Sequence, residues 1–259
     1  MRLRFDIVEV AGILLIAVVA TTFLQQQLRP GQRGPHMIEG DLLGELQTRF
    51  GHELYSQGPE EWLIRDFFND RRNGVFVDVG AFHPVNFSNS YRLERDLGWT
   101  GIAIDALKEF AKPFAELRPN SRFFTAFVGE TDTGEATLHV DPEIALVASG
   151  DPAFTAEFTS KAVAIQVRRR TLDSILREAG VTKVDFVSLD IELGEPAALK
   201  GFSLADHQPE LLCIEAHRKS RQAILDIMTR AGYVVVGRYL RIDEANLYFT
   251  PLRSARLDD

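Results

Sequence analysis

Short apolar runs recur along the chain from residue 75 onward, and polar or turn-forming residues separate them. Runs of this length and composition predict buried β-strands. Several of the segments between them repeat apolar residues every three to four positions, as amphipathic helices do. Strands that alternate with helices predict an α/β fold, in which a mostly parallel sheet is covered by helices on both faces.

Individual elements follow from this pattern. The predicted buried strands and helices are, in order, strands at 75–81, 101–106, 122–129, 184–192 and 210–217, an alternating strand at 135–140, and helices within 41–73, at 107–117 and at 219–231. Residues 163–176 predict a strand that runs into a helix capped by Thr171. Residues 141–160, with two prolines, predict a loop. The last strands, at 233–240 and 246–250, predict an antiparallel hairpin at one edge of the sheet.

The first 40 residues follow a different pattern. Residues 10–24 carry no charge, and a helix needs about 20 apolar residues to span a bilayer, so residues 1–24 predict a short transmembrane anchor. A cleaved signal peptide and a buried core helix remain alternatives. Residues 25–40, rich in glutamine, proline and glycine, predict a linker to a domain over 41–259. Arginines lie on both sides of the apolar stretch, so charge does not settle its orientation.

Composition narrows the classes of function. The 259 residues carry a formal net charge of −8, which argues against nucleic acid as a general partner. Cys213 is the single cysteine, so the chain forms neither an intramolecular disulfide nor a cysteine-rich zinc site. Apolar residues make up 45% of the chain, an ordinary globular value that argues against disorder and against a polytopic membrane protein.

Carboxylates end most of the predicted strands. In an open α/β sheet, ligands bind beyond the carboxyl ends of the strands. Gly80 lets the backbone after the first strand approach a ligand closely, but Pro84 stands where a dinucleotide-binding glycine motif needs a small residue. Asp105 ends the next strand, where a carboxylate can accept both hydroxyls of a ribose. A nucleoside without a pyrophosphate points to S-adenosylmethionine (SAM) as cofactor.

Several longer motifs carry a family resemblance. They are VFVDVGAFHPVNFSNSYRLERDLGWTGIAIDA (75–106), TLDSIL (171–176), VDFVSLDIELGEPAALKGF (184–202) and LLCIEAH (211–217). With them the chain resembles the FkbM family of SAM-dependent methyltransferases over most of residues 74–250. The resemblance implies a Rossmann-like class I methyltransferase fold. One departure lies in the segment 190–195, where Leu193 replaces the glycine of the family's usual D-[VI]-E-G-A-E.

The resemblance also implies cofactor contacts. Asp78 and Gly80, with Ala81 beside them, are expected at the methionine end of SAM, and Asp105 at its ribose. Asp190 is expected to face the cofactor's amino group or the substrate. Two further residues of the first loop, Ser88 and Asn89, either bind the cofactor carboxylate or cap the following helix.

His217 is the first candidate for a general base, because a histidine titrates near neutral pH and an attacking hydroxyl must lose a proton. It could instead only bond a carboxylate to hold a loop, and His83 is the alternative base. Glu192 either binds the substrate, as a second catalytic residue, or pairs with Lys200 or Arg218. No ligand spacing demands a metal, so none is predicted, although Asp190, Glu192, Glu215 and His217 are suitable donors. The segment 141–162 is a candidate lid over the acceptor.

These observations predict an O-methyltransferase that acts on a hydroxyl of a sugar, lipid or small metabolite. The alternative is a membrane-tethered, non-catalytic binding or scaffold protein with the same fold. A nicotinamide-dependent oxidoreductase is disfavoured, because the glycine motif is absent. Since SAM is a cytoplasmic metabolite, we expect a single-pass membrane protein whose catalytic domain faces the cytoplasm.

Overall fold

The computed structural model describes residues 42–252. The predicted membrane anchor, its signal-peptide and core-helix alternatives, and the linker all lie outside the described residues. Within 42–252, no helix combines the length and the apolar character needed to cross a membrane.

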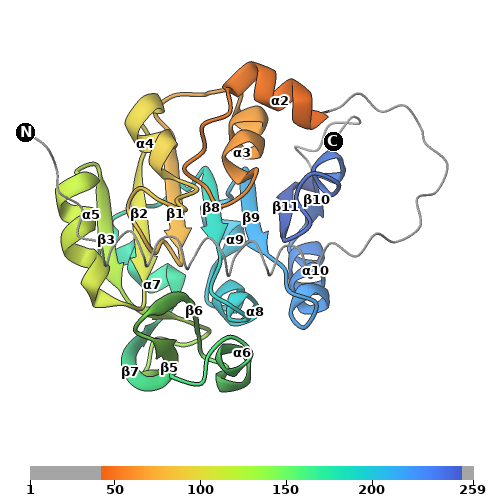
Figure 1. Cartoon of the computed structure of the whole chain (residues 1–259). Helices are drawn as coiled ribbons and strands as arrows, with labels where there is room; N and C mark the ends of the chain where they lie inside the picture. The colour runs from red at the N-terminus through yellow and green to blue at the C-terminus, as the bar shows by residue number, and fades with distance from the viewer. Residues whose placement is uncertain (1–41, 253–259) are drawn as a thin grey trace, which may run out of the picture.

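A seven-stranded sheet forms the centre of the molecule (Figure 1). Its strands, in spatial order, are β10 (Tyr233–Val235), β11 (Asn246–Pro251), β9 (Leu211–Glu215), β8 (Phe186–Leu189), β1 (Val75–Val79), β2 (Thr100–Asp105) and β3 (Ser121–Thr125). All neighbours from β9 to β3 pair in parallel, while β11 is antiparallel to both β9 and β10. The predicted parallel sheet with an antiparallel pair at one edge is therefore confirmed.

Helices cover both faces of this sheet, because successive strand residues point to opposite sides. Val77 and Val79 of β1 face one core, where they pack with helices from residues 172–230. Those helices are α7 (Leu172–Ala179), α8 (Glu195–Lys200), α9 (Leu204–His207) and α10 (Arg221–Arg230). Phe76 faces the opposite core, together with Trp62, Leu93 and Trp99.

The helices of that second core come from the first part of the described chain. They are α2 (Leu42–Phe50), α3 (Glu60–Phe68) and α4 (Tyr91–Leu97), and Figure 1 shows them on one side of the sheet, with α8 and α10 on the other. A short 3₁₀ turn, η1 (Lys108–Phe110), leads into α5 (Ala111–Leu117), which packs against β3. The predicted helices at 41–73, 107–117 and 219–231 are thus confirmed, with shorter bounds.

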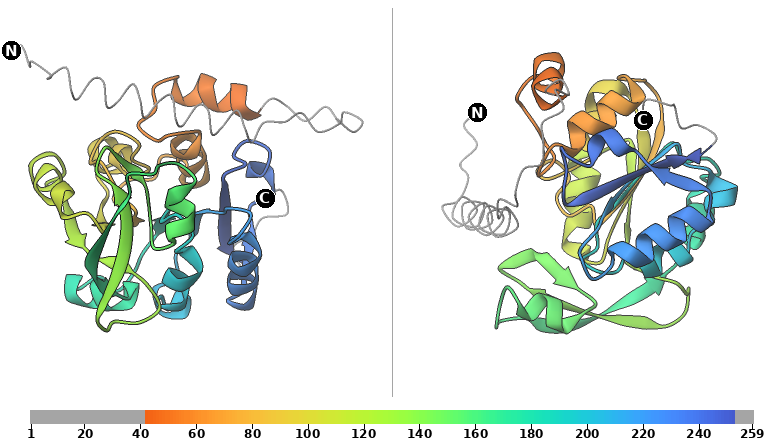
Figure 2. Two further views of the ribbon diagram at one scale, coloured as in Figure 1. Left: turned by 60° about the horizontal axis from the view of Figure 1, so that its bottom comes forward. Right: turned by 90° about the vertical axis from the view of Figure 1, so that its right-hand side faces the viewer.

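A second, four-stranded sheet was not predicted as a separate layer (Figure 2). Its order is β4 (Phe127–Val128), β7 (Val163–Arg170), β5 (Glu135–Asp141) and β6 (Ile144–Ser149). The single strand predicted at 122–129 is wrong: the chain leaves the main sheet at Ala126, whose N–H donates to the Asp105 carbonyl at 2.9 Å. The second sheet has its own small core, formed by Leu107, Leu138, Val140 and Val167.

The loop predicted at 141–160 is also wrong, because this segment contains β6 and the helix α6 (Pro152–Ala156). Asp151 caps α6, and Pro152 opens it, a place where a missing N–H costs nothing. Of two other local predictions, the structure confirms one and shortens the other. Thr171 caps α7 as predicted, by accepting the Ser174 N–H, whereas the strand predicted at 233–240 ends at Val235 and gives way to the 3₁₀ turn η2 (Gly237–Tyr239).

Candidate active site

A cavity of about 180 Å³ lies at the carboxyl ends of β1, β2, β8 and β9. From β1 the chain continues outward to β2 and β3, and then returns to the other side of β1 as β8. This change of direction is the place where open α/β sheets bind ligands. The second sheet forms the facing wall, with Leu138, Ala145 and Val147 among its lining residues.

Gly80 lines the cavity directly after β1, and its backbone has φ +80°, which is costly for residues with a side chain. A Cβ atom at this position would lie 1.7 Å from the carbonyl oxygen of Asp190. The N–H groups of Gly80 and Ala81 both donate to the Ile104 carbonyl, at 2.9 and 3.1 Å. Gly80 therefore lets the loop pack against the end of β8. Ala81 is buried in a separate cluster with Ala103 and Phe114 and does not line the cavity.

Asp105 lines the same cavity from the end of β2. Its two carboxylate oxygens accept the backbone N–H groups of Leu107 at 2.8 Å and of Phe82 at 2.9 Å. Each oxygen keeps a lone pair for a hydroxyl donor. Burial raises the pKa of Asp105 to about 6, although the two backbone N–H groups act in the opposite direction. The carboxylate is held in a fixed orientation, as hydrogen bonding to a ribose requires.

Asp78 lies on the opposite face of β1 from Val79 and does not line the cavity. It accepts a hydrogen bond from the Ser90 hydroxyl at 2.5 Å, and burial raises the pKa of its carboxyl. Ser88 accepts the Tyr91 N–H at 3.1 Å, so it caps the start of α4, and Asn89 donates to the Ser188 hydroxyl at 3.0 Å. For Ser88 the geometry favours the capping alternative. Cofactor contacts of Asp78, Ser88 and Asn89 stay predictions.

Arg118 was missed by the sequence analysis, although it holds this loop from behind. The side chain is fully buried and donates to Ser90 and to the Pro84 carbonyl, at 3.1 and 2.9 Å. It also pairs with the buried Glu94 of α4. A buried arginine has no local signature in a sequence, and the partners of Arg118 lie as far as 34 residues away along the chain.

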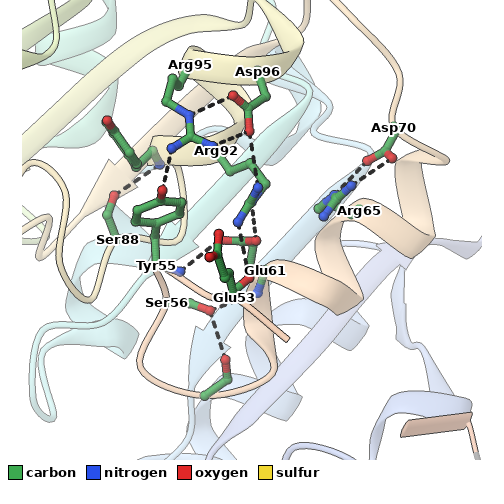
Figure 3. A network of polar contacts seen from close by, with 12 residues as sticks. Glu53, Tyr55, Ser56, Glu61, Arg65, Asp70, Ser88, Arg92, Arg95 and Asp96 are labelled. Carbon is green, nitrogen blue, oxygen red and sulfur yellow. Dashed lines mark hydrogen bonds and ion pairs between the residues drawn. The ribbon is translucent and has the colours of Figure 1, made fainter. Parts of the chain in front are cut away.

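A second polar network holds the segment that precedes α3 (Figure 3). The Tyr55 carbonyl accepts the Ser88 N–H at 2.9 Å, and the Tyr55 N–H donates to Glu61 at 3.0 Å. Arg92 of α4 also bonds Glu61. These contacts tie the segment to the first loop and place Gln57 in the lining of the cavity. Gln57 is a further site residue that the sequence analysis missed.

His217, Glu192 and Glu215 meet at the other side of the cavity. The Nε2 atom of His217 lies 3.0 Å from Glu192 Oε2 and 3.0 Å from Glu215 Oε1. The ring of Phe154, from α6, meets the imidazole edge to face with centroids 5.1 Å apart. Glu192 therefore pairs with His217 and not with Lys200, whose ammonium group bonds Glu130.

The electrostatics of this cluster differ from those expected of a neutral imidazole. Burial raises the pKa of both Glu192 and Glu215 to about 7. Burial lowers the pKa of His217, but hydrogen bonds to the two glutamates and their charges outweigh it and raise the pKa to about 11. His217 thus carries a proton near neutral pH and shares it with two carboxylates. His83, the alternative base, uses Nδ1 to accept the Val85 and Asn86 N–H groups and lies outside the lining.

The turn after β8 has an unusual backbone. Glu192 and Leu193 adopt φ values of +52° and +77°, a left-handed conformation that costs residues with a side chain. The hydroxyl of Ser149, at the end of β6, donates to the Glu192 carbonyl at 2.6 Å. Leu193 thus holds a left-handed backbone with a side chain attached, and it stays outside the cavity lining. Ser149 is a third residue that the sequence analysis missed.

Asp190 lines the cavity beside this cluster, and its contact with the cofactor or the substrate stays a prediction. Burial and the neighbouring Glu215 carboxylate raise its pKa well above the usual value. The structure therefore brings together five of the predicted residues, which are Gly80, Asp105, Asp190, Glu192 and His217.

A family model and several solved structures match this chain. The family model of the methyltransferase FkbM domain matches residues 78–235, and no curated protein matches the chain. A TehB-like SAM-dependent methyltransferase from Corynebacterium glutamicum is 11% identical, with a TM-score of 0.41 over 90% of this chain and 98% of its own. A SAM-dependent methyltransferase from Thiobacillus denitrificans, solved with S-adenosylhomocysteine, is 12% identical, with a TM-score of 0.38 over 81% and 80%.

A third solved structure is the 1,6-didemethyltoxoflavin-N1-methyltransferase of Burkholderia thailandensis, 10% identical, with a TM-score of 0.38 over 97% of this chain and 93% of its own. The family match spans more than half of the chain, from Asp78 in β1 to Val235 in β10, and includes every cavity residue that ends a main-sheet strand. The chain belongs to the FkbM family of SAM-dependent methyltransferases.

Proposed function

We propose that the protein methylates a hydroxyl oxygen of a small molecule, a glycan or a lipid. The observation that carries the proposal is the shared cavity, which has Asp105 on one side and the Glu192–His217–Glu215 cluster on the other. The first side suits a nucleoside, because a buried carboxylate is presented to ribose hydroxyls. The second suits an acceptor hydroxyl, because it offers polar groups that can orient an O–H and take up its proton.

The residues at the nucleoside side fit SAM. Asp105 offers an acceptor to the ribose, and Gly80 lines the same cavity with backbone atoms only. Leu107, Phe127 and Val128 line the cavity near Asp105 and provide apolar surface for a base. When bound, SAM supplies an electrophilic methyl group, whose carbon bonds the acceptor oxygen while the electron pair of the carbon–sulfur bond passes to sulfur.

The cluster at the other side acts on the acceptor. Glu192, in contact with His217, accepts a hydrogen bond from the hydroxyl and orients a lone pair of its oxygen toward the methyl group. As the new bond forms, the hydroxyl proton passes to the cluster, where His217 and Glu215 stabilise the resulting charge distribution. His217 acts in this proposal with its two glutamates and not as an isolated neutral base.

The second sheet and α6 exclude water from the reacting groups. Val147 of β6 and Phe154 of α6 are buried and line the cavity, and Phe154 packs on His217. Exclusion of water strengthens the hydrogen bonds inside the site. This supports the interpretation of residues 141–162 as the cover of the acceptor, although the segment is built from β6 and α6 and not from a loop.

Two measurements test the proposed function. Isothermal calorimetry on the full 259-residue chain is expected to show saturable binding of SAM, and Asp105→Asn to weaken it. Incubation with methyl-labelled SAM and a cell extract is expected to yield a labelled product whose methyl group sits on oxygen, and Glu192→Gln to reduce its formation. Binding without transfer to any component would favour the alternative of a non-catalytic binding protein, and transfer to nitrogen or carbon would overturn O-methylation.

We further propose that residues 1–24 anchor the chain in a membrane with the catalytic domain in the cytoplasm, which would bring the site close to lipid-borne acceptors. The uncharged stretch 10–24 and the cytoplasmic origin of SAM support this. Protease digestion of membrane vesicles tests it, because a cytoplasmic domain is protected in right-side-out vesicles and digested in inverted ones. Recovery of the chain entirely in the soluble fraction would contradict it.

A further inference from the structure

Four carboxylates and one imidazole gather where β8 and β9 end. Asp190, Glu192 and Glu195 follow β8 within six residues, while Glu215 and His217 end and follow β9. Three donor atoms, one each from Glu192, Glu215 and His217, lie within 4.8 Å of one another. Asp190 and Glu215 also line the same cavity. Carboxylates gathered this closely repel one another unless protons or a cation lie between them.

Buried oxygens without partners mark this cluster further. Glu195 is fully buried; its Oε1 accepts the Ile191 N–H at 3.1 Å, but its Oε2 has no hydrogen-bond partner. Its charge acts on Asp190, Glu192 and Glu215, so it belongs to the same cluster. The buried Oε2 of Glu215 also lacks a partner. An acceptor left unbonded in the interior costs about 1–3 kcal/mol, more when it is charged, so these oxygens indicate a ligand that the protein side chains do not provide.

The distances around His217 suit a bound metal ion. Nε2 lies 3.0 Å from one oxygen of Glu192 and 3.0 Å from one oxygen of Glu215. In an octahedral site with bonds of about 2.1 Å, neighbouring ligand atoms are separated by about 3.0 Å. A proton on Nε2 and a metal ion therefore compete for the same position. Carboxylate oxygens favour hard ions, and one imidazole nitrogen is compatible with Mn²⁺ as well as Mg²⁺.

We propose that Glu192, Glu215 and His217 bind a divalent cation of the Mn²⁺ or Mg²⁺ class, with Asp190 and Glu195 as acceptors for its bound water. Three protein ligands leave positions open in a six-coordinate ion. This role rests on the proposed function: the ion would hold the acceptor oxygen in one of these positions and, as a Lewis acid, favour transfer of its proton to the carboxylate of Asp190, which lines the same cavity. The acceptor would then be an oxygen ligand and not a cationic amine, which a divalent ion repels.

Electron paramagnetic resonance of Mn²⁺ tests the site without SAM or acceptor. The full chain is freed of metal with a chelator and titrated with MnCl₂, and the signal of free Mn²⁺ measures binding. We expect one ion per chain, and at least tenfold weaker binding in Glu192→Gln and in Glu215→Gln, since each removes a charged ligand. Glu130→Gln is the matched control, because Glu130 is exposed and pairs with Lys200 on the surface. It should bind Mn²⁺ as the wild type does.

Pulsed electron paramagnetic resonance of the wild-type protein with bound Mn²⁺ provides a readout that needs no variant. Coupling of the Mn²⁺ electron spin to an imidazole nitrogen is expected, and its absence would overturn the role of His217. Lack of binding at millimolar Mn²⁺ and Mg²⁺, binding of Zn²⁺ alone, or equal binding in all three variants would overturn the site. Mn²⁺ binding without methyl transfer would refute the proposed function alone, whereas methyl transfer unchanged by the chelator would refute the catalytic use of the ion.

Discussion

The backbone of Gly80 touches the backbone of Asp190 so closely that a Cβ atom on Gly80 would lie 1.7 Å from the Asp190 carbonyl oxygen. This contact joins the ends of β1 and β8, where the order in which the chain adds strands to the sheet reverses. The cofactor loop and the acidic turn are thereby packed as one unit. A side chain cannot enter this space unless one strand end moves.

Gly80→Ala is therefore expected to lower both stability and SAM affinity. The left-handed φ alone costs about 1–2 kcal/mol, and displacement of the Asp190 carbonyl adds to it. Denaturant unfolding and calorimetric SAM titration measure the two effects. Gly180→Ala is the matched control, since Gly180 has φ +69° but nothing within 4 Å of the position that a Cβ atom would take. Equal loss of stability in both variants would show that the close approach to Asp190 does not matter.

Asp105 predicts a pH dependence of SAM affinity. The carboxylate form accepts ribose hydroxyls, and burial raises its pKa to about 6, with Glu109 and Asp78 adding to the shift. SAM affinity should therefore fall as the pH drops below about 6. Asp105→Asn should bind SAM at least about tenfold more weakly, because a charge-assisted hydrogen bond is lost, and with little dependence on pH. Calorimetry across this range checks both, and parallel pH profiles for the two proteins would contradict the assignment.

Asp105 also makes folding stability depend on pH, with a sign opposite to that of SAM affinity. Because the folded state holds the Asp105 proton more tightly than the unfolded state, the stabilising contribution is complete below the unfolded pKa and is lost as the pH rises through about 6. Asp105→Asn resembles the protonated form. Its free energy of unfolding, relative to wild type, should increase between about pH 4 and about pH 7. A difference that stays constant with pH would be inconsistent with the raised pKa.

Ser149 links the second sheet to the catalytic turn. Its hydroxyl donates to the Glu192 carbonyl at 2.6 Å and accepts the Asp151 N–H at 3.0 Å. Ser149→Ala should lower stability by about 1 kcal/mol and lower kcat several-fold, while KM for SAM changes little, because Asp105 is untouched. Thr48→Ala, which removes an exposed hydroxyl from α2, is the control. A rise in KM for SAM with unchanged kcat would place Ser149 at the cofactor instead.

Leu193 offers a test of backbone strain. Leu193 has φ +77° and lies outside the cavity lining, so Leu193→Gly relieves strain without altering the site. We expect the variant to be more stable by about 0.5–1 kcal/mol, after the entropy of the unfolded glycine is taken into account. Leu43→Gly, at the second position of α2, should instead lose up to about 1 kcal/mol. Comparable destabilisation in both variants would contradict the strain.

Local patterns in the sequence were sufficient for the main sheet. Apolar runs such as 75–79 and 211–215 are short and flanked by turn residues, and a fully buried parallel strand needs that composition whatever its neighbours are. The same patterns placed Gly80, Asp105 and Asp190 at strand ends, where the topology of an α/β sheet brings ligands. Periodicity could not show that the chain changes sheet at Ala126, because no turn-forming residue separates β3 from β4.

The residues that end the strands, and their chemical groups, could thus be predicted from local patterns. The way in which those groups combine follows from tertiary contacts alone. His217 contacts Glu192 across 25 residues and Ser149 contacts it across 43, through pairing of β8 with β9 and packing of β6 against the turn. Asp78 and Asp105 both lie near strand ends, yet one faces a helix-covered side and the other the cavity. Such contacts depend on burial of many distant side chains at once, which no local pattern encodes.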